Sequence, residues 1–350
     1  MDKYGWTSVA FQGRRKFIVL AGLFLSLTIS VLAFHSITPL NLTSTSPWKG
    51  HRGSRNPVHP LTSNPVAAII ENRPLTNLIP LILHFAAVLG PDWPIIIFTS
   101  LNTTNIKASA PFERALASSQ IRIHALPPQQ SFTSHRDVSA FLTGPWFWEQ
   151  LAPASHVLLF QSDSIICANA EQKMEDFLQY DFVGAPIASG LGQGYNGGLS
   201  LRNREMCLNI TRNNSWEEMW QENADLRKQQ EEQKHQQIQE EQAQHEASQE
   251  GSTQRRSDIF PDNPAEPFED YEDQWFFKRM TELPLQLDGR PGANLPSEEI
   301  AKTFAVETVY HEQPLGYHQP GVFIADKISE IEAWCPEYRL TSGKGFNTWE

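Results

Sequence analysis

The sequence has little cysteine, and its three cysteines, Cys167, Cys207 and Cys335, lie far apart. No CxxC pair or mixed Cys/His cluster has the spacing of a zinc site, which argues against a metal–thiolate centre. In an oxidising compartment one pair can form a disulfide and leave one thiol free, but the sequence does not select the pair. Three buried, small apolar side chains are the alternative interpretation.

Basic residues are also scarce relative to acidic ones. The chain has 28 Lys and Arg against 40 Asp and Glu, a formal net charge of -12 at pH 7. This charge gives no general attraction to a phosphate backbone, and the sequence has no local basic stripe. We therefore expect no nucleic-acid partner. With 350 residues, 40% hydrophobic and 11% aromatic, the chain is sufficient for one substantial core.

Charge is absent from residues 17–34, FIVLAGLFLSLTISVLAF. As a helix this segment spans about 27 Å, close to the roughly 30 Å of a hydrocarbon core. The basic triplet 14–16 precedes it, and no Lys or Arg follows until Lys49, so the positive-inside rule places the N-terminus in the cytoplasm. We expect a cytoplasmic tail at 1–16, a transmembrane signal-anchor at 17–34, and a single-pass type II protein of the Golgi or endoplasmic reticulum membrane.

A cleaved signal peptide, which would give a soluble secreted enzyme, is the alternative for this apolar segment. However, the apolar run exceeds the usual ~7–15 residues, and no clear A-x-A cleavage site follows. In either case the chain enters the secretory pathway with its C-terminal domain in the lumen. N-glycosylation sequons agree with this topology, although such tripeptides are common by chance. They lie at Asn41, Asn102, Asn209 and Asn213.

Residues 35–64 are rich in Ser, Thr, Pro and Asn and have no apolar period, which predicts an unpacked lumenal stem. Over residues 65–350 we expect one α/β domain, because short apolar runs alternate with longer amphipathic ones. This alternation predicts a mainly parallel sheet with flanking helices. The strand-like runs are residues 66–70, 94–98, 121–126 and 156–160.

An insertion in this domain is predicted at about residues 216–258. Within 221–250, seventeen of thirty residues are Glu or Gln, and there is no Pro or Gly. A helix of this composition is polar on every face, so the tract is either a solvated helix or a disordered insertion. It lacks the repeated apolar residues that a coiled coil needs.

The strand-like run 156–160 ends in a polar turn that carries Gln161 and Asp163. Ligands of open α/β sheets gather at the carboxyl ends of strands. A carboxylate there can hold Mg²⁺ or Mn²⁺ that bridges a diphosphate. Alternatively, Asp163 caps a helix that starts near Asn169 or forms an Asx-turn.

Gly192, Gly194 and Gly197 match the pattern G-x-G-x-x-G. We expect no dinucleotide-binding site, because a strand-like segment follows where that fingerprint requires a helix. Asn196, Gly197 and Gly198 can instead let the backbone approach a sugar, with the Asn amide as donor and acceptor. A purely structural glycine turn is an equal alternative.

A cluster of carboxylates precedes an aromatic helix, and His318 follows later in PLGYHQPG. Clustered carboxylates raise one another's pKa and can poise a general base for a sugar hydroxyl. Alternatively, they cap the positive N-terminus of the helix while residues 275–277 enter the core. His318 is a candidate metal ligand or phosphate partner, although a lone His is more often structural. The carboxylates are Glu269, Asp270, Glu272 and Asp273.

These segments, taken together, resemble a known family. They are NRP at 72–74, LILHFAAVLGPDWPIIIFTS, LLFQSDSIIC, DFVGAPI, YNGGLSLR, EDQWFF, PLGYHQP and WCPEYRL. They are similar to an uncharacterised family of fungal proteins described only as a domain of unknown function. That family is regarded as glycosyltransferase-like, with a GT-A type fold. The resemblance covers roughly residues 66–340 apart from the Gln/Glu-rich tract.

The resemblance implies that Asp163 stands at the acidic metal position of GT-A enzymes. Those enzymes usually have two aspartates flanking one residue, whereas this sequence has Gln161, Ser162 and Asp163. A divalent cation, Mn²⁺ or Mg²⁺, would therefore bind more weakly or not be required. The resemblance assigns donor binding to Arg73, Gln161, Asp163 and His318, metal binding to Asp163 and His318, acceptor binding to Asn196, Gly197 and Gly198, and a catalytic base to Asp273 or Glu272.

We therefore expect a glycosyltransferase that moves a sugar from a nucleotide-diphosphate donor to a hydroxyl of a glycan or glycoprotein. If the transfer retains configuration, no base is required. The alternative is a catalytically silent, membrane-tethered module that binds glycans or partners, and Gln161 in place of an acid favours it. Binding of nucleotide sugars with and without Mn²⁺ distinguishes a live donor site from a silent one.

Overall fold

The computed structural model describes residues 64–100, 109–248 and 271–341. The expected tail and signal-anchor, nearly all of the stem, and the sequons Asn41 and Asn102 lie outside these residues, so these assignments stay predictions. Within the described ranges, no helix combines the length and the apolar character needed to cross a bilayer.

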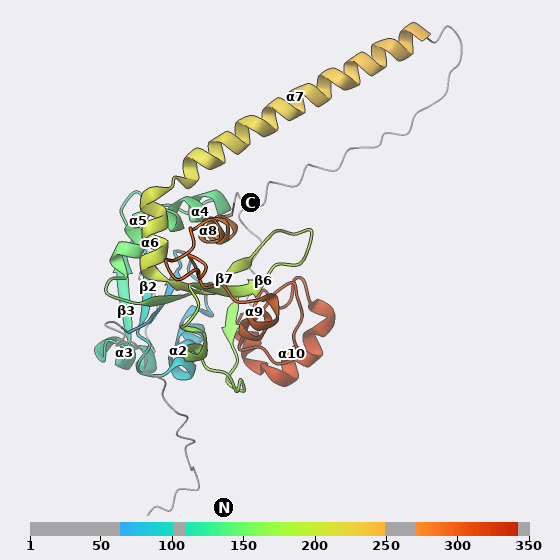
Figure 1. Cartoon of the computed structure of the whole chain (residues 1–350). Coiled ribbons are helices and arrows are strands. Elements are labelled where there is room, and N and C mark those ends of the chain that lie inside the picture. Colours follow the sequence, from blue (N-terminus) through green and yellow to red (C-terminus); the bar gives the residue numbers. More distant parts are fainter. Residues whose placement is uncertain (1–63, 101–108, 249–270, 342–350) are drawn as a thin grey trace, which may run out of the picture. The chain divides into compact units, whose positions relative to one another are not determined.

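A six-stranded mixed sheet forms the core, in the order β3-β2-β1-β4-β7-β6 (Figure 1). Neighbours among β3, β2, β1 and β4 pair parallel, whereas β7 is antiparallel to both β4 and β6. Of the described strands in this sheet, β7 alone is reversed. The strands are β1 (Val66–Ile70), β2 (Ile95–Thr99), β3 (Ile121–Ala125), β4 (His156–Phe160), β6 (Phe182–Pro186) and β7 (Tyr195–Asn203).

Composition explains the position of the central strands. β4, HVLLF, is buried at all five positions, and β1, VAAII, at four of five. Continuous apolar runs of this kind belong to parallel strands that are covered on both faces. The predicted α/β class is therefore confirmed, with a mixed sheet and helices.

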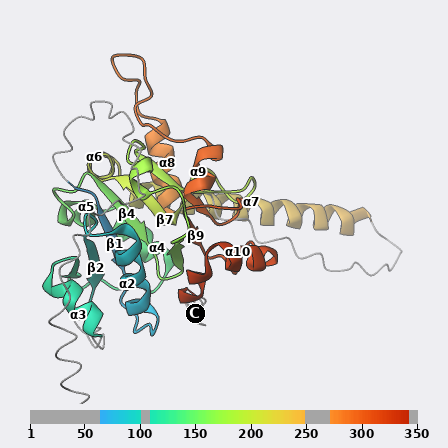
Figure 2. The same ribbon diagram turned by 90° about the horizontal axis from the view of Figure 1, so that it is seen from below.

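Helices cover both faces of this sheet (Figures 1 and 2). α2 and α3 lie on one face, and α4, α5, α6 and α8 lie on the other. On α8 the predicted aromatic segment enters the core, because Trp275 and Phe276 are buried and Phe277 packs against them. The helices are α2 (Leu78–Leu89), α3 (Ala110–Ala117), α4 (His135–Leu142), α5 (Pro145–Gln150), α6 (Arg204–Asn213) and α8 (Glu272–Thr281).

Local sequence sets where these helices begin. Ser109 and Asn203 accept hydrogen bonds from the backbone N–H groups of the first turns of α3 and α6. α4 starts with a capping box in which Ser134 accepts from the Asp137 N–H and Asp137 accepts from the Ser134 N–H. Such caps satisfy backbone donors that a helix leaves unpaired at its N-terminus.

A smaller three-stranded sheet, β5-β9-β8, follows the carboxyl end of β4. The disulfide Cys167–Cys335 joins the end of β5 to the end of α10, with a Cα–Cα distance of 5.0 Å, and Cys207 is a buried free thiol. The structure thus selects the pair that the sequence left open. The elements here are η2 (Met174–Phe177), α9 (Glu298–Phe304), β8 (Ala305–Val306), β5 (Ser164–Ile166), β9 (Gly316–His318), η4 (Ala325–Lys327), α10 (Ile328–Trp334) and η5 (Pro336–Leu340).

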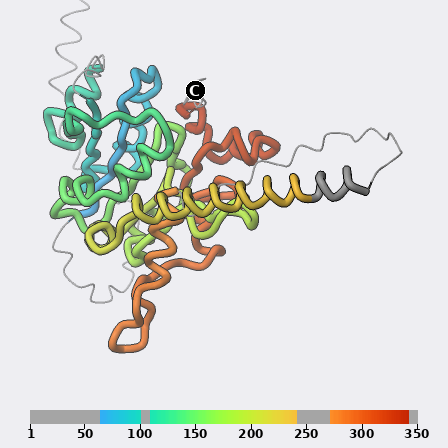
Figure 3. Tube along the Cα trace, turned by 90° about the horizontal axis from the view of Figure 1, so that it is seen from above, coloured from blue at the N-terminus to red at the C-terminus, as the bar shows by residue number. Residues whose placement is uncertain are grey.

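The Gln/Glu-rich tract forms one long helix, α7 (Trp216–Ser248), which leaves the sheet and its helices (Figure 3). Its first turn belongs to the core, since Trp216 is buried and Trp220 packs against buried residues. Residues 231–240 are all exposed. Of the two predicted states, the helix is therefore found, with its backbone described as far as Ser248, and residues 249–258 lie outside the described ranges.

Candidate functional site

The carboxyl ends of β1 and β4 meet where the order of strands reverses. From β1 the chain adds β2 and β3 on one side, and it then returns to place β4 on the other side. In open α/β sheets this switch point leaves a crevice in which ligands bind. A cleft lies at this point, lined by Glu71 and Arg73 after β1, residues 161–163 after β4, His135 of α4, and Gln319 after β9.

The lining of the cleft is partly apolar and partly polar. Phe132, Val138 and Leu159 line it together with the polar groups that follow β1 and β4. Its volume is about 120 Å³, below the ~300–1,000 Å³ typical of pockets that enclose a drug-sized ligand. A ligand as large as a nucleotide sugar would therefore occupy it with one end and extend beyond it.

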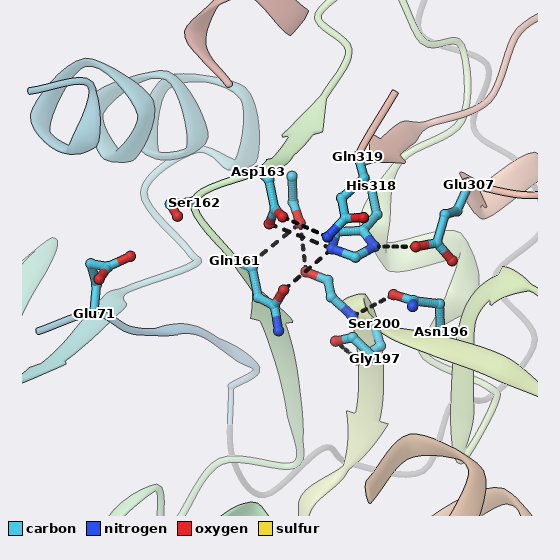
Figure 4. Close-up of polar contacts among 12 residues, drawn as sticks. Glu71, Gln161, Ser162, Asp163, Asn196, Gly197, Ser200, Glu307, His318 and Gln319 are labelled. Carbon is cyan, nitrogen blue, oxygen red and sulfur yellow. Dashed lines mark hydrogen bonds and ion pairs between the residues drawn. The ribbon is translucent and has the colours of Figure 1, made fainter. Parts of the chain in front are cut away.

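Asp163 is directed toward β9 and the residue after it (Figure 4). Its Oδ1 lies 3.4 Å from His318 Nε2, and its Oδ2 accepts a hydrogen bond of 2.9 Å from Gln319 Nε2. The backbone N–H of Gln319 donates to the carbonyl of Asp163 at 3.1 Å. Asp163 caps no described helix, since the first helix after it, η2, begins at Met174.

Both ring nitrogens of His318 face acceptors. Nδ1 lies 2.8 Å from Glu307 Oε1, and Nε2 lies 3.2 Å from Gln161 Oε1 (Figure 4). Burial opposes a charge on the ring, but Asp163 and Glu307 outweigh it and raise the pKa of His318 to about 10. Burial also opposes ionisation of Asp163, yet His318 and Gln319 outweigh it and hold its pKa below the usual value.

Three atoms of the kinds that bind a divalent cation lie near one another here, and as a metal ligand His318 would have to lose the proton that its raised pKa favours. His318 Nε2 lies 3.2 Å from Gln161 Oε1 and 3.4 Å from Asp163 Oδ1. Neighbouring ligands of an octahedral ion with bonds of about 2.1 Å are about 3 Å apart. Glu307 on Nδ1 supplies the carboxylate that usually orients a metal-binding His. The set has one carboxylate, and within the described ranges no three His, Cys, Asp or Glu side chains group to hold a metal.

Arg73 brings a cation to the opposite wall of the cleft. Its Nε and Nη2 each lie 2.8 Å from a carboxylate oxygen of Glu71, and Nη2 lies 3.3 Å from Ser162 Oγ. Glu71 is buried, whereas the Arg73 side chain is 34% exposed. The hydrogen bonds to Glu71 raise the pKa of Arg73. The pair therefore holds a guanidinium group at the junction of β1 and β4, partly open to solvent.

Glu272 and Asp273 lie elsewhere, between α8 and β7. Glu272 forms two bonds, of 2.6 and 2.9 Å, with the guanidinium of Arg202, whose side chain is 0% exposed. Asp273 accepts from the backbone N–H groups of Gly197 and Gln274, at 2.7 Å each. Burial, and then the charge of Glu272, raise the pKa of Asp273 to about 7. Neither carboxylate lines the cleft, and Glu269 and Asp270 lie outside the described residues.

The glycines of β7 are packed against protein side chains. A Cβ atom on Gly198 would collide with the ring of His318, and one on Gly197 would lie 2.5 Å from Glu272 Oε1. Asn196 Oδ1 accepts from the Gly198 N–H at 2.7 Å. This geometry favours the structural role that the sequence left open for Asn196 to Gly198. A strand, not a helix, follows Gly194, as expected.

The structure thus brings Arg73, Gln161, Asp163 and His318 together, and it separates them from Glu272 and Asp273. One connection between the two groups remains. Asp273 accepts from the N–H of Gly197, and the carbonyl of the next residue, Gly198, accepts a hydrogen bond of 2.9 Å from the Gln161 N–H. Glu272 and Asp273 therefore lie outside the cleft, and Asp273 helps to hold the segment of β7 that contacts Gln161.

Sequence reasoning missed four residues of the site: Glu71, His135, Glu307 and Gln319. Glu71 directly follows the strand-like run of β1, so the strand-end rule applied to Asp163 would have found it. Glu307 follows a strand of only two residues, too short to show a pattern. Gln319 has a φ of 44°, a left-handed conformation uncommon outside glycine, and no local pattern announced it.

No curated protein matches this chain significantly. Among solved structures, the apo-form glycosyltransferase GlyE of Streptococcus pneumoniae is 14% identical, with a TM-score of 0.29, and the match covers 48% of this chain and 39% of GlyE. A fragment of S. aureus TarS in complex with UDP-GlcNAc is 11% identical, with a TM-score of 0.29, over 41% of this chain and 46% of that chain.

Core-mannan synthase A of Aspergillus fumigatus in its Mn/GDP form is 10% identical, with a TM-score of 0.27, over 43% of this chain and 62% of that enzyme. This chain thus spans less than half of the GlyE and TarS chains. At such TM-scores no residue role is transferred from these structures. The model of a family described as "Protein of unknown function (DUF5672)" matches residues 120–318, more than half of the chain, and the chain belongs to that family.

Proposed function

We propose that the chain is a glycosyltransferase of GT-A-like fold whose cleft holds the nucleotide-diphosphate part of a sugar donor. The observation that carries this proposal is the placement of Arg73, Gln161, Asp163 and His318 at one topological switch point. The acceptor in this proposal is a hydroxyl of a glycan or glycoprotein.

The residues at and beside the cleft have different roles in this proposal. The partly exposed Arg73 donates charge-assisted hydrogen bonds to phosphate oxygens, while Glu71 fixes its orientation. Asp163 Oδ1, Gln161 Oε1 and His318 Nε2 would hold Mn²⁺ or Mg²⁺, with Glu307 orienting the His318 ring. When bound, such a cation neutralises charge that develops on the leaving diphosphate.

An inverting transfer needs a general base that activates the acceptor hydroxyl. A pKa of about 7 suits Asp273 to a general base, but its carboxylate is buried against Gly197 and Gln274. Asp273 or Glu272 could act as the base only if an acceptor reached the strand segment Asn196 to Gly198. A transfer that retains configuration needs no base.

The second candidate function, a catalytically silent binding module, has one specific observation in its favour. His318 already contacts Gln161 Oε1 and Asp163 Oδ1, and Gln319 already contacts Asp163 Oδ2. The polar atoms that would meet a donor are thus satisfied within the protein. A module of this kind would bind glycans or a partner without turning over a donor.

We also propose that the domain lies in the lumen of the Golgi or endoplasmic reticulum, tethered by residues 17–34. The disulfide Cys167–Cys335 supports an oxidising compartment, and Asn209 and Asn213 are exposed on α6. In sealed microsomes the C-terminal domain should resist added protease and carry N-glycans. Digestion of that domain by external protease would contradict the topology.

A thermal-shift screen of nucleotide sugars, with and without Mn²⁺, tests donor binding directly. A ligand at 100 times its Kd stabilises the folded state by about 2.7 kcal/mol. We expect stabilisation by at least one nucleotide sugar, and stabilisation by none would contradict a live donor site. Binding without donor hydrolysis or transfer would favour the silent module.

A further inference from the structure

The first turn of α4 lies between the cleft and the start of α7. His135, the first residue of α4, lines the cleft. Its neighbour Arg136 contacts α7 instead: the guanidinium lies 4.2 Å from the centroid of the Trp220 ring and forms an ion pair with Glu217. One short turn therefore connects the cleft wall to the helix of the Gln/Glu-rich tract.

The first described residue after the insertion also contacts this turn. Tyr271, the residue before α8, has its ring 6.3 Å from the ring of His135, in an edge-on arrangement. Trp220 directly precedes the Gln/Glu-rich residues 221–250, Tyr271 follows them, and both contact the first turn of α4. Residues on both sides of this tract thus contact the turn that borders the cleft.

α4 is too short to hold its position without contacts to other elements. It has eight residues, and isolated helices of this length are not stable in water. The capping box of Ser134 and Asp137 fixes where the helix begins but not where the turn lies relative to β1 and β4. Contacts with other elements must set that position.

We propose that Arg136 and Trp220 are positioning residues that hold the first turn of α4 against the cleft and so place His135 for the ligand. The first turns of α7, residues 216–220, then serve the binding site. The exposed residues 231–240 of α7 do not contribute to it. This inference rests on the proposed function only in the choice of nucleotide sugar as the ligand.

The structure offers a matched control for this pair. Arg212 forms a 2.7 Å ion pair with Glu149 and is 53% exposed, comparable to Arg136 at 42%. The control pair joins α6 to α5, whereas the pair of Arg136 and Glu217 joins α4 to α7. Arg136→Ala and Arg212→Ala therefore each remove one exposed ion pair, but only the first frees the turn that bears His135.

The experiment measures nucleotide-sugar affinity and amide hydrogen exchange on the full-length chain. We expect Arg136→Ala and Trp220→Ala to raise the Kd about three- to tenfold, the range expected for losing one exposed cation–π contact and ion pair. Arg212→Ala and a Gly/Ser replacement of residues 221–250 should leave Kd unchanged. Arg136→Lys keeps the charge but loses the planar stacking, so it should restore only part of the affinity.

Hydrogen exchange keeps the test independent of the proposed function. Residues 135–139 should exchange faster in Arg136→Ala than in Arg212→Ala, whether or not a nucleotide sugar binds. Equal exchange in the two variants would overturn the proposal. If exchange differs but the wild-type chain binds no nucleotide sugar, the positioning of α4 stands and the proposed donor site falls.

Discussion

Two buried clusters of charge in this domain have similar composition and different surroundings. In the first, which we call the cleft cluster, Asp163, Gln161 and Gln319 line the cleft, and His318 and Glu307 lie buried beside Asp163. Arg202, Glu272 and Asp273 instead lie in a closed space between α8 and β7. The Arg202 guanidinium lies 4.7 Å from the Phe182 ring centroid and 5.5 Å from that of Phe276, so aromatic rings cover it.

The comparison shows that acidic clustering alone does not identify a site. Sequence patterns predict a chemical role for both clusters, because both have carboxylates near the boundary of a helix or strand. Only the cluster at the carboxyl ends of β1 and β4 borders space in which a ligand fits. We therefore expect changes in the closed cluster to affect stability, and changes in the cleft cluster to affect binding.

The largest expected effect follows from Arg202→Met. Removing this side chain leaves Glu272 buried without its cation, which costs about 3–5 kcal/mol of unfolding free energy. Urea unfolding measures the loss, and the double variant Arg202→Met/Glu272→Leu should recover much of it. A single variant as stable as wild type would show that the closed cluster contributes little.

The second prediction concerns the pH dependence of stability. The folded-state pKa of Asp273 is about 7 against an ordinary 3.8, so the folded state binds its proton more tightly than the unfolded state. Its contribution is therefore fully present below about pH 4 and is lost as the pH rises through 7, at up to about 1.4 kcal/mol per pH unit. Asp273→Asn should flatten the curve of unfolding free energy between pH 4.5 and 8, whereas the exposed Asp225→Asn should not.

Two glycines of β7 test this comparison, because Gly198 faces the cleft cluster and Gly197 faces the closed cluster. Gly198→Ala forces a methyl group against His318, and Gly197→Ala forces one against Glu272 and Arg202. Each should destabilise the fold by about 1–3 kcal/mol through overpacking. Only Gly198→Ala should also weaken nucleotide-sugar binding in a titration of the folded protein. Equal binding by both variants would remove the distinction between the clusters.

The smallest effect is expected from replacing residues 221–250 with a short Gly/Ser linker. Trp216 and Trp220 are retained, and residues 231–240 are exposed, so little packing is lost. The melting temperature of the domain should change by no more than about 2 °C, since exposed substitutions usually cost under ~0.5 kcal/mol. A loss of several kcal/mol would show that the tract packs against the core.

Much of this fold could be predicted, because its central strands are continuous apolar runs. Residues 66–70, 121–126 and 156–160 match β1, β3 and β4 closely, and the strand-end rule located Asp163. The reversal of β7 could not be predicted, since strand direction depends on connections and not on local pattern. Nor could the contact between Asp163 and His318, which are 155 residues apart in sequence and meet only because β5 pairs with β9.

The first residues of α7 show a further limit of sequence patterns. The change in composition near Trp216 and Trp220 predicts that both belong to the Gln/Glu-rich insertion. In the structure Trp216 is buried and Trp220 contacts Arg136 of α4. The first turn of this polar helix therefore belongs to the core. The helix leaves the core about one turn after the composition of the sequence changes.

The central claim is that the cleft cluster binds a nucleotide-sugar donor through Asp163. The most direct measurement compares nucleotide-sugar binding and turnover, with and without Mn²⁺, in wild type, Asp163→Asn and Gln161→Asp. We expect Asp163→Asn to fold and to lose about 30- to 1000-fold in rate, equivalent to ~2–4 kcal/mol of transition-state stabilisation. Gln161→Asp should increase the dependence on Mn²⁺ by adding a second carboxylate beside Asp163. Unchanged binding and turnover in Asp163→Asn would contradict the claim.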